Sequence, residues 1–275
     1  MHEPAEKTGM RNAWGRVAAG YDDLWAQRTT AFTEAALDLL DPAPDGAGLD
    51  IGCGPGHTAV ALARRLTGGA TTGVDFSPSM VERARERWSD VPGLAFELDD
   101  AEHLSVADAS VDVVTSSFTL MYCYDALAAT AHVARVLRPG GTALLLVWGP
   151  HRDVWWSPVI DIVESRAQYY SSVCPMMFFY GLPGVLPRML EDVGLEVEAS
   201  AGLDTPMRYA DVEEAVSAAV LAGPLAGLFQ NRLDDDAKAV AWREMTDHVA
   251  SVAVQSGRGI SLPARVEAVV ARAPG

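Results

Sequence analysis

Short apolar runs alternate with longer amphipathic runs between about residues 46 and 149 of the chain. Short β-branched runs bounded by turn residues are typical of strands, and their alternation with helical runs predicts a parallel sheet with crossover helices. The strand runs are mostly apolar and show no clean alternation with polar residues, so we expect both faces of the sheet to be covered. The predicted strands are residues 47–52, 71–76, 94–98, 111–118 and 142–148, and the predicted helices are residues 56–66, 78–88 and 126–137.

Two local signals sharpen the limits of these helices. Ser77 and Pro78 follow the second predicted strand, and serine is favoured as an N-cap while proline is favoured as the first helical residue. The run 138–141, Arg-Pro-Gly-Gly, is expected to end the helix of residues 126–137.

The regular rhythm breaks after Gly149, which predicts a cap built from two insertions. Residues of about 151–185 are rich in aromatic side chains, from Trp155 to Tyr180 and including Tyr170. Residues of about 211–256 are expected to form two helices, the first opened by a capping box from Asp211 to Glu214. The remaining segments are predicted as a helix at residues 186–193 and strands at residues 195–200 and 263–271.

Charge and cysteine content narrow the class of protein. The 275 residues include 21 Lys and Arg against 37 Asp and Glu, a formal net charge of −16, which disfavours a nucleic-acid partner. The cysteines at positions 53, 123 and 174 lie far apart, so neither a disulfide framework nor a zinc ribbon is expected. Residues 1–10 lack the apolar core of a signal peptide, and the charge-free stretch 167–187 is interrupted by prolines. We therefore expect a cytoplasmic protein without a membrane span.

The sharpest chemical signal lies where the first predicted strand meets the first helix, at residues 49–56, Leu-Asp-Ile-Gly-Cys-Gly-Pro-Gly. Glycines at such a turn let a ligand approach the backbone, and the amides at the start of the helix favour an anionic group. The third glycine, Gly56, falls one residue early for the dinucleotide fingerprint, which argues against NAD. A tight turn without a ligand is the alternative reading.

Acidic residues end the next two predicted strands. Asp75 follows the glycine turn at the distance expected of a carboxylate that accepts both ribose hydroxyls. Residues 99–102, Asp-Asp-Ala-Glu, end the third strand, where an acid would accept the exocyclic amine of adenine. Taken singly, each is equally a solvated acid at a strand end, but together with the glycine turn they predict an adenosine site.

Five motifs in order carry a family resemblance: residues 50–56 (DIGCGPG), 73–80 (GVDFSPSM), 100–104 (DAEHL), 109–112 (ASVD) and 135–141 (RVLRPGG). As a set they resemble the class I S-adenosylmethionine (SAM) dependent methyltransferases, especially the branch of ubiquinone and menaquinone biosynthesis enzymes and small-molecule tailoring enzymes. The resemblance covers about residues 46–149. Ser105 and Val111 depart from the frequent Pro and Phe of the family, at positions not expected to touch the cofactor.

The resemblance implies an α/β fold with a Rossmann-like, seven-stranded sheet, mostly parallel with its last strand antiparallel, plus a helical cap. It divides the chain into an N-terminal helical segment closing over the cofactor (1–45), a SAM-binding core (46–150) and the rest of the sheet with the cap insertions (151–275). The implied cofactor is SAM, leaving as S-adenosylhomocysteine. The residues that it implies for cofactor binding are Tyr21, Asp50, Gly52, Gly54, Asp75, Phe76, Met80, Asp100, Ala101 and Ser117.

The acceptor side is less defined. His151 follows the fifth predicted strand at the ligand-binding edge and is our candidate for a base, with a surface histidine as the alternative. The candidates for the acceptor pocket are Tyr122, Tyr124, Phe179 and Tyr180, with core packing as the alternative. No zinc motif or nucleophile elbow is present, so no metal is expected.

These features predict transfer of a methyl group from SAM to O, N or C of a small, partly apolar metabolite of secondary metabolism. One alternative is a SAM-binding fold repurposed as a non-methylating cyclase or other tailoring catalyst. Another is a non-catalytic SAM-binding partner whose cap is a protein interface. The expected state is a monomer or a homodimer.

Overall fold

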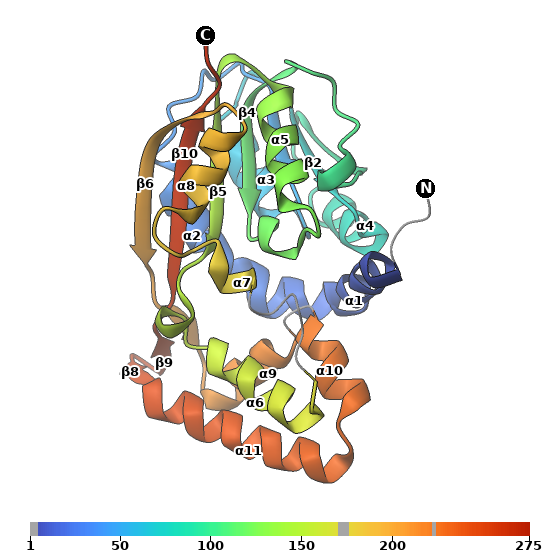
Figure 1. Ribbon diagram of the computed structural model, residues 1–275, viewed down its shortest axis with the longest axis vertical. Helices are drawn as coiled ribbons and strands as arrows, with labels where there is room; N and C mark the ends of the chain where they lie inside the picture. Colours follow the sequence, from blue (N-terminus) through green and yellow to red (C-terminus); the bar gives the residue numbers. More distant parts are fainter. Residues whose placement is uncertain (1–4, 170–175, 222–223) are drawn as a thin grey trace.

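The computed structural model describes residues 5–169, 176–221 and 224–275, so Tyr170 and Cys174 lie outside the described residues. A seven-stranded sheet forms the centre of the upper part in Figure 1. Its strands are β1 (Gly48–Ile51), β2 (Thr71–Asp75), β3 (Leu94–Leu98), β4 (Val111–Ser117), β5 (Leu137–Trp148), β6 (Glu196–Asp204) and β10 (Arg265–Arg272).

The strand order, β3-β2-β1-β4-β5-β10-β6, reverses direction between β1 and β4. β1 to β5 pair in parallel, whereas β10 is antiparallel to both β5 and β6. The predicted seven-stranded sheet with an antiparallel last strand is therefore confirmed. In such open sheets ligands bind beyond the carboxyl ends of the strands at the point of reversal, here the ends of β1 and β4.

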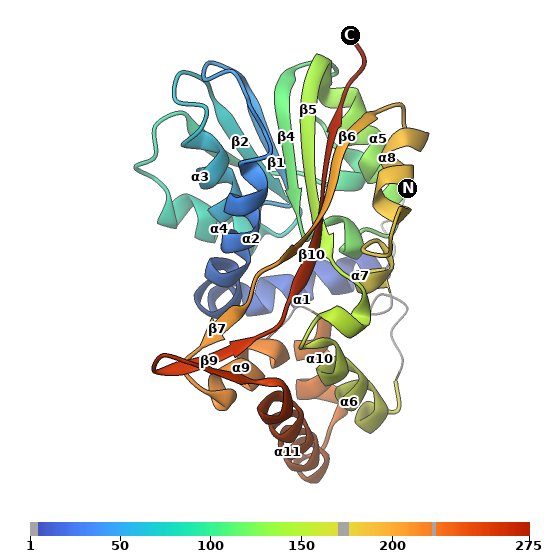
Figure 2. The ribbon, with the colours of Figure 1, turned by 90° about the vertical axis from the view of Figure 1, so that its left-hand side faces the viewer.

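Helices cover both faces of the sheet, as the apolar strands predicted. The sheet is seen nearly edge-on in Figure 2, with α2 (Gln27–Leu37), α3 (His57–Ala63) and α4 (Pro78–Arg87) on one side. On the other side lie α5 (Ala126–Val136) and α8 (Val185–Asp192). All four residues of β1 are buried as a result.

A helical layer lies below the carboxyl edge of the sheet. It contains α6 (Ser157–Ala167), α9 (Val212–Val220), α10 (Pro224–Arg232) and α11 (Asp235–Val252), with the short α7 (Met176–Phe179) nearer the sheet. A second sheet of three strands, β7 (Met207–Tyr209), β8 (Val254–Ser256) and β9 (Gly259–Leu262), flanks this layer, and β6 and β10 run down toward it (Figure 2).

The N-terminal helices lie between the two parts. α1 (Ala5–Tyr21) crosses the lower edge of the sheet, packing on α4 and on α10 (Figure 1). A five-residue π-helix, η1 (Asp22–Ala26), joins α1 to α2. Short π-helical segments inside α-helices are rare overall, but those that occur lie frequently at functional sites.

Most predicted elements occur with small shifts of their limits. Pro78 is the first residue of α4, as expected, but the Ser77 hydroxyl makes no capping bond. Asp211 caps α9 by accepting from the Glu214 amide at 2.8 Å. β5 begins at Leu137, ahead of the predicted residue 142, because Leu137 already pairs with Val111 of β4, and the turn that follows bonds to Ala273 through Gly140 and Gly141.

Two expectations for residues 211–256 were wrong. The segment forms three helices rather than two, and it ends in β8.

Among the described residues no single helix is both long and apolar enough to cross a bilayer. The pair Val212–Val220 and Leu225–Arg232, bent by 92°, passes that test only when joined.

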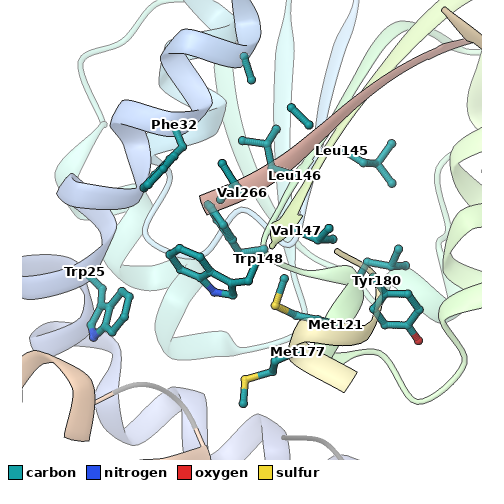
Figure 3. Close-up of a cluster of buried hydrophobic side chains, with 14 of the residues drawn as sticks. Trp25, Phe32, Met121, Leu145, Leu146, Val147, Trp148, Met177, Tyr180 and Val266 are labelled. Atoms are coloured by element: carbon teal, nitrogen blue, oxygen red, sulfur yellow. The ribbon is translucent and has the colours of Figure 1, made fainter. Parts of the chain in front are cut away.

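Aromatic side chains fill the space between the sheet and the lower layer. Figure 3 shows Trp148 at the end of β5, facing Phe32 and Trp25 on one side and Met121 and Met177 on the other. Trp148 is 3% exposed, and its ring centroid lies 4.5 Å from that of Phe118. This cluster makes the end of β5 part of a core shared by both layers.

Candidate functional site

A cleft opens at the carboxyl edge of the sheet, at the point of strand reversal, with α1 along one side. Its lining combines the turn after β1, the ends of β2 and β3, the segment after β4, and α1 as far as its last residue, Tyr21. The lining residues are Lys7, Trp14, Tyr21, Gly52, Gly54, Asp75, Phe76, Met80, Asp99, Asp100, Ala101, Glu102, Ser117, Phe118, Thr119, Tyr122 and Cys123.

The glycine turn has a backbone that other residues adopt rarely. Gly52, Gly54 and Gly56 have φ angles of +72°, +52° and +92°. A Cβ atom at Gly52 would overlap the Thr119 side chain, whereas one at Gly54 would meet no atom within 4 Å. The backbone at Gly54 is therefore bare and open, the condition under which a ligand approaches a main chain closely.

Asp75 lies beside this turn and is 8% exposed. Its Oδ2 accepts from the Gly54 amide at 2.9 Å and its Oδ1 from the Ser77 amide at 2.8 Å. Burial raises the pKa of Asp75 to about 6, against the opposing effect of these two amides. The carboxylate is thus fixed in orientation and retains lone pairs for a hydroxyl donor.

Asp50, at the end of β1, does not line the cleft. It is 1% exposed and accepts from the Thr115 hydroxyl at 2.8 Å. Burial, together with the neighbouring Asp75, raises the pKa of Asp50 to about 7. The structure thus places Asp50, which was predicted to bind the cofactor, two residues before Gly52 and outside the cleft lining.

Asp100 is held by two partners rather than left free. Its Oδ1 accepts from the Glu102 amide at 3.0 Å, and its Oδ2 lies 2.6 Å from Nζ of Lys7 on α1. Burial opposes ionisation of Asp100, but Lys7, the Glu102 amide and the nearby His103 together outweigh it and lower the pKa. The predicted reader of the adenine edge is therefore already ion-paired.

Tyr21, the last residue of α1, and Asp22, the first residue of η1, have different surroundings. Tyr21 lines the cleft, and burial and the nearby Asp75 raise its pKa to about 12. Asp22 is fully buried outside the lining and binds His57 and Arg83, each at 2.7 Å, and Arg87 at 3.2 Å. Asp22 thereby ties η1 to α3 and α4.

Of the acceptor-side candidates, the structure brings only Tyr122 to the cleft. His151 is 47% exposed at its side chain and pairs with Asp161 at 3.2 Å, away from the cleft lining. Tyr124 and Phe179 are exposed and Tyr180 is buried in the core, so only Tyr122 of this group lines the cleft. His151 therefore lies outside the cleft in which we expect the cofactor, and its position gives no support to a role as a base.

Sequence reasoning missed part of the lining. Lys7 and Trp14 lie in a segment predicted only as a helix that closes over the cofactor, and Phe118, Thr119 and Cys123 lie between predicted residues. Phe118 carried no sequence signal for its positive φ of 58°, which is rare outside glycine. Among the described residues no group of three or more His, Cys, Asp or Glu side chains is placed to hold a metal ion.

Comparisons with known proteins agree with this geometry. Residues 49–141 match the family model described as a methyltransferase domain. An uncharacterised 37.1 kDa protein in a transposon of Streptomyces fradiae is 33% identical over 222 residues, 77% of this chain and 64% of that protein. The ubiquinone/menaquinone biosynthesis C-methyltransferase UbiE of Desulfotalea psychrophila is 34% identical over 176 residues, 63% of this chain and 61% of that enzyme. The chain thus spans less than two thirds of either relative's length.

A solved structure shares the fold. The crystal structure of a methyltransferase-like protein from Bacillus halodurans superposes with a TM-score of 0.61 at 16% identity, covering 88% of this chain and 99% of that one. Residues 49–141 thus match a methyltransferase domain, and the chain resembles the class I SAM-dependent methyltransferases, whose cofactor is SAM. The residues present fit that cofactor, because the bare backbone at Gly54, the fixed carboxylate of Asp75 and the apolar Phe76 and Met80 line one cleft.

Proposed function

We propose that this chain transfers the methyl group of SAM to an oxygen, nitrogen or carbon atom of a small, partly apolar molecule. The observation that carries the proposal is the convergence of the glycine turn, Asp75 and the η2 segment (Ala101–His103) on one cleft at the point of strand reversal. When bound, SAM would supply an electrophilic methyl group: a bond would form between the acceptor nucleophile and the methyl carbon as the carbon–sulfur bond breaks in line, and its electron pair would leave with sulfur as S-adenosylhomocysteine.

The roles that we propose for the chain follow the lining. Gly52 and Gly54 would receive the methionine moiety along the backbone of the turn, which is bare at Gly54, with Asp50 supporting the turn from below. Asp75 would hold the ribose hydroxyls. The adenine ring would lie between Phe76 and Met80, with its edge at Asp100 and the Ala101 amide. Ser117 would face the sulfonium, and Tyr21 would close over the cofactor.

The acceptor would meet the cleft where β4 ends. Phe118, Thr119, Tyr122 and Cys123 line this part, and all are uncharged or aromatic. Burial raises the pKa of the Cys123 thiol, so it is neutral near pH 7. This uncharged wall supports a partly apolar acceptor and a site that acts by orienting the nucleophile and excluding water.

A calorimetric titration tests the cofactor assignment. Protein freed of carried-over ligand is titrated separately with SAM, S-adenosylhomocysteine and NADH. We expect micromolar binding of the two sulfur ligands and none of NADH. Absence of binding by both sulfur ligands to folded protein would contradict the proposal.

The variant Asp75→Ala tests the ribose contact. We expect it to abolish binding of S-adenosylhomocysteine, while the matched Asp90→Ala, at an exposed aspartate in the connection between α4 and β3, binds as the parent does. Circular dichroism of both variants establishes that they fold. Unchanged affinity in Asp75→Ala would remove the ribose role.

Formation of S-adenosylhomocysteine in step with a methylated product separates methyl transfer from the alternatives, a non-methylating cyclase and a non-catalytic SAM-binding partner. An acceptor screen with labelled methyl provides this measurement. A role in secondary metabolism, a cytoplasmic location and a monomeric or homodimeric state stay predictions.

A further inference from the structure

The side chain of Lys7, on the first turns of α1, is inserted into the cleft at its nucleoside end. Its Nζ lies 2.6 Å from Asp100 Oδ2 and 3.1 Å from Glu102 Oε2, and the residue is 5% exposed. An ammonium group between two carboxylates in a site this sheltered is well paired and costly to remove.

The ion pair uses the oxygens that an adenine edge would need. The other oxygen of Asp100 accepts from the Glu102 amide, and the other oxygen of Glu102 accepts from the Tyr124 amide at 2.9 Å. His103 Nδ1 also lies 3.5 Å from Asp100 Oδ2. A purine amine that donates to Asp100 therefore competes with Lys7 for the same oxygen.

The cleft is also narrow while α1 lies across it. Its volume is about 90 Å³, well below the roughly 300–1,000 Å³ of pockets that hold small ligands. Lys7, Trp14 and Tyr21 together bring α1 and the residue that ends it into the lining. Entry of a nucleoside-sized ligand thus requires α1 to shift away from the nucleoside end.

Apart from the ion pair of Lys7, the backbone of the first turns of α1 opposes such a shift only weakly. Gly9 and Gly15 lie inside the helix, and each interior glycine lowers helix stability by about 1 kcal/mol relative to alanine. A Cβ atom at Gly9 would meet nothing within 4 Å, so packing does not require glycine there. The far end of α1, by contrast, continues into η1, which Asp22 anchors to α3 and α4.

We propose that Lys7 is an internal competitor for the adenine-reading carboxylate, which holds α1 closed on the ligand-free cleft and leaves when the cofactor binds. The inference rests on the proposed function. It gives Lys7 the role of setting cofactor affinity. Lys7 lies outside residues 49–141, which match the methyltransferase domain.

Chemical labelling of amines tests the displacement in the parent protein. The lysines of the chain are Lys7 and Lys238, so Lys238 on α11 is an internal reference. Reductive methylation with formaldehyde, read by peptide mass spectrometry, is run with and without saturating S-adenosylhomocysteine. We expect the labelling rate of Lys7 to rise several-fold with the ligand, while that of Lys238 stays constant. A Lys7 rate that is unchanged or lower with bound ligand overturns the inference.

The variant Lys7→Met keeps an unbranched side chain and removes the charge. We expect calorimetry to show that it binds S-adenosylhomocysteine about tenfold more tightly. Without the ion pair, a larger fraction of molecules has the cleft open for the ligand, and apparent affinity rises in proportion to that fraction. Lys238→Met is the matched control and should bind as the parent does.

Failure of the inference and failure of the proposed function give different results. Equal, measurable affinity of the parent and Lys7→Met would overturn the competitor role and leave the cofactor assignment standing. Absence of binding by both proteins, each shown to be folded, would overturn the cofactor assignment and the competitor role with it.

Discussion

At the scale of single residues, the proposed ribose contact of Asp75 predicts that cofactor binding depends on pH. Burial raises its pKa from 3.8 to about 6, and only the carboxylate accepts two hydroxyl donors. Affinity for S-adenosylhomocysteine should therefore be constant above about pH 7 and fall roughly tenfold by pH 5, as the group becomes protonated. Calorimetry at a series of pH values measures this.

The neighbouring Asp50 requires a control, because burial raises its pKa to about 7 and two close acids titrate as a pair. Asp75→Asn should bind weakly at every pH, without the fall, whereas Asp50→Asn should keep it. A fall that persists in Asp75→Asn would assign the pH dependence to another group.

The same scale shows what sequence reasoning could reach in the site. Gly52, Gly54 and Asp75 were predictable, because a tight turn and a strand end demand those residue types within a short segment. Lys7 was not, because its partners Asp100 and Glu102 are distant in sequence and an isolated lysine carries no local pattern. His151 was misplaced because closeness to a strand end along the chain does not fix the direction that the following turn takes.

At the scale of elements, Asp22 fixes the π-helix that joins α1 to α2. Its carboxylate is fully buried and faces His57, Arg83 and Arg87. Asp22→Ala removes the shared partner of these three side chains, so we expect the free energy of unfolding to fall by about 1–3 kcal/mol. Urea unfolding followed by circular dichroism measures the loss.

The adjacent Asp23 provides the matched control, since its side chain is 65% exposed and lies 3.7 Å from Arg83. Asp23→Ala should cost about 0–1 kcal/mol. Burial opposes ionisation of Asp22, but its bonds to His57 and Arg83 lower the pKa below 3.8. Its stabilisation is therefore present above pH 3.8 and is lost as the pH falls below that value. Equal losses in both variants would show that the buried network does not anchor η1.

Elements differed in how well the sequence foretold them. The strands β1, β2, β4 and β5 are buried on both faces, so their apolar runs were plain. The three-stranded sheet was missed because β7, β8 and β9 have only three or four residues each and β8 is largely exposed. Strands this short are specified by tertiary pairing more than by their own sequence.

At the scale of the whole molecule, buried tryptophans join the sheet to the lower helical layer. The ring of Trp25, in η1, lies 6.0 Å from Trp148 of β5 and 5.5 Å from Trp156, which precedes α6. The Trp25 indole N–H also donates to the Ala218 carbonyl in α9. Because one aromatic cluster serves both layers, we expect them to unfold in a single transition.

Replacement of two of these tryptophans by phenylalanine tests the junction. Trp25 and Trp156 are 2% and 1% exposed, so each substitution removes a similar buried volume. The Trp156 indole N–H has no hydrogen-bond partner within the described part of the chain, whereas that of Trp25 is bonded to Ala218. Trp25→Phe removes this donor from the Ala218 carbonyl, which keeps the Leu221 amide at 3.0 Å, and Trp156→Phe removes an N–H that was already unpaired. We therefore expect Trp25→Phe to lower the free energy of unfolding by about 0.5–1.5 kcal/mol more than Trp156→Phe. Urea titrations of both variants measure the difference, and a larger loss for Trp156→Phe would show that ring packing, not this hydrogen bond, holds the two layers together.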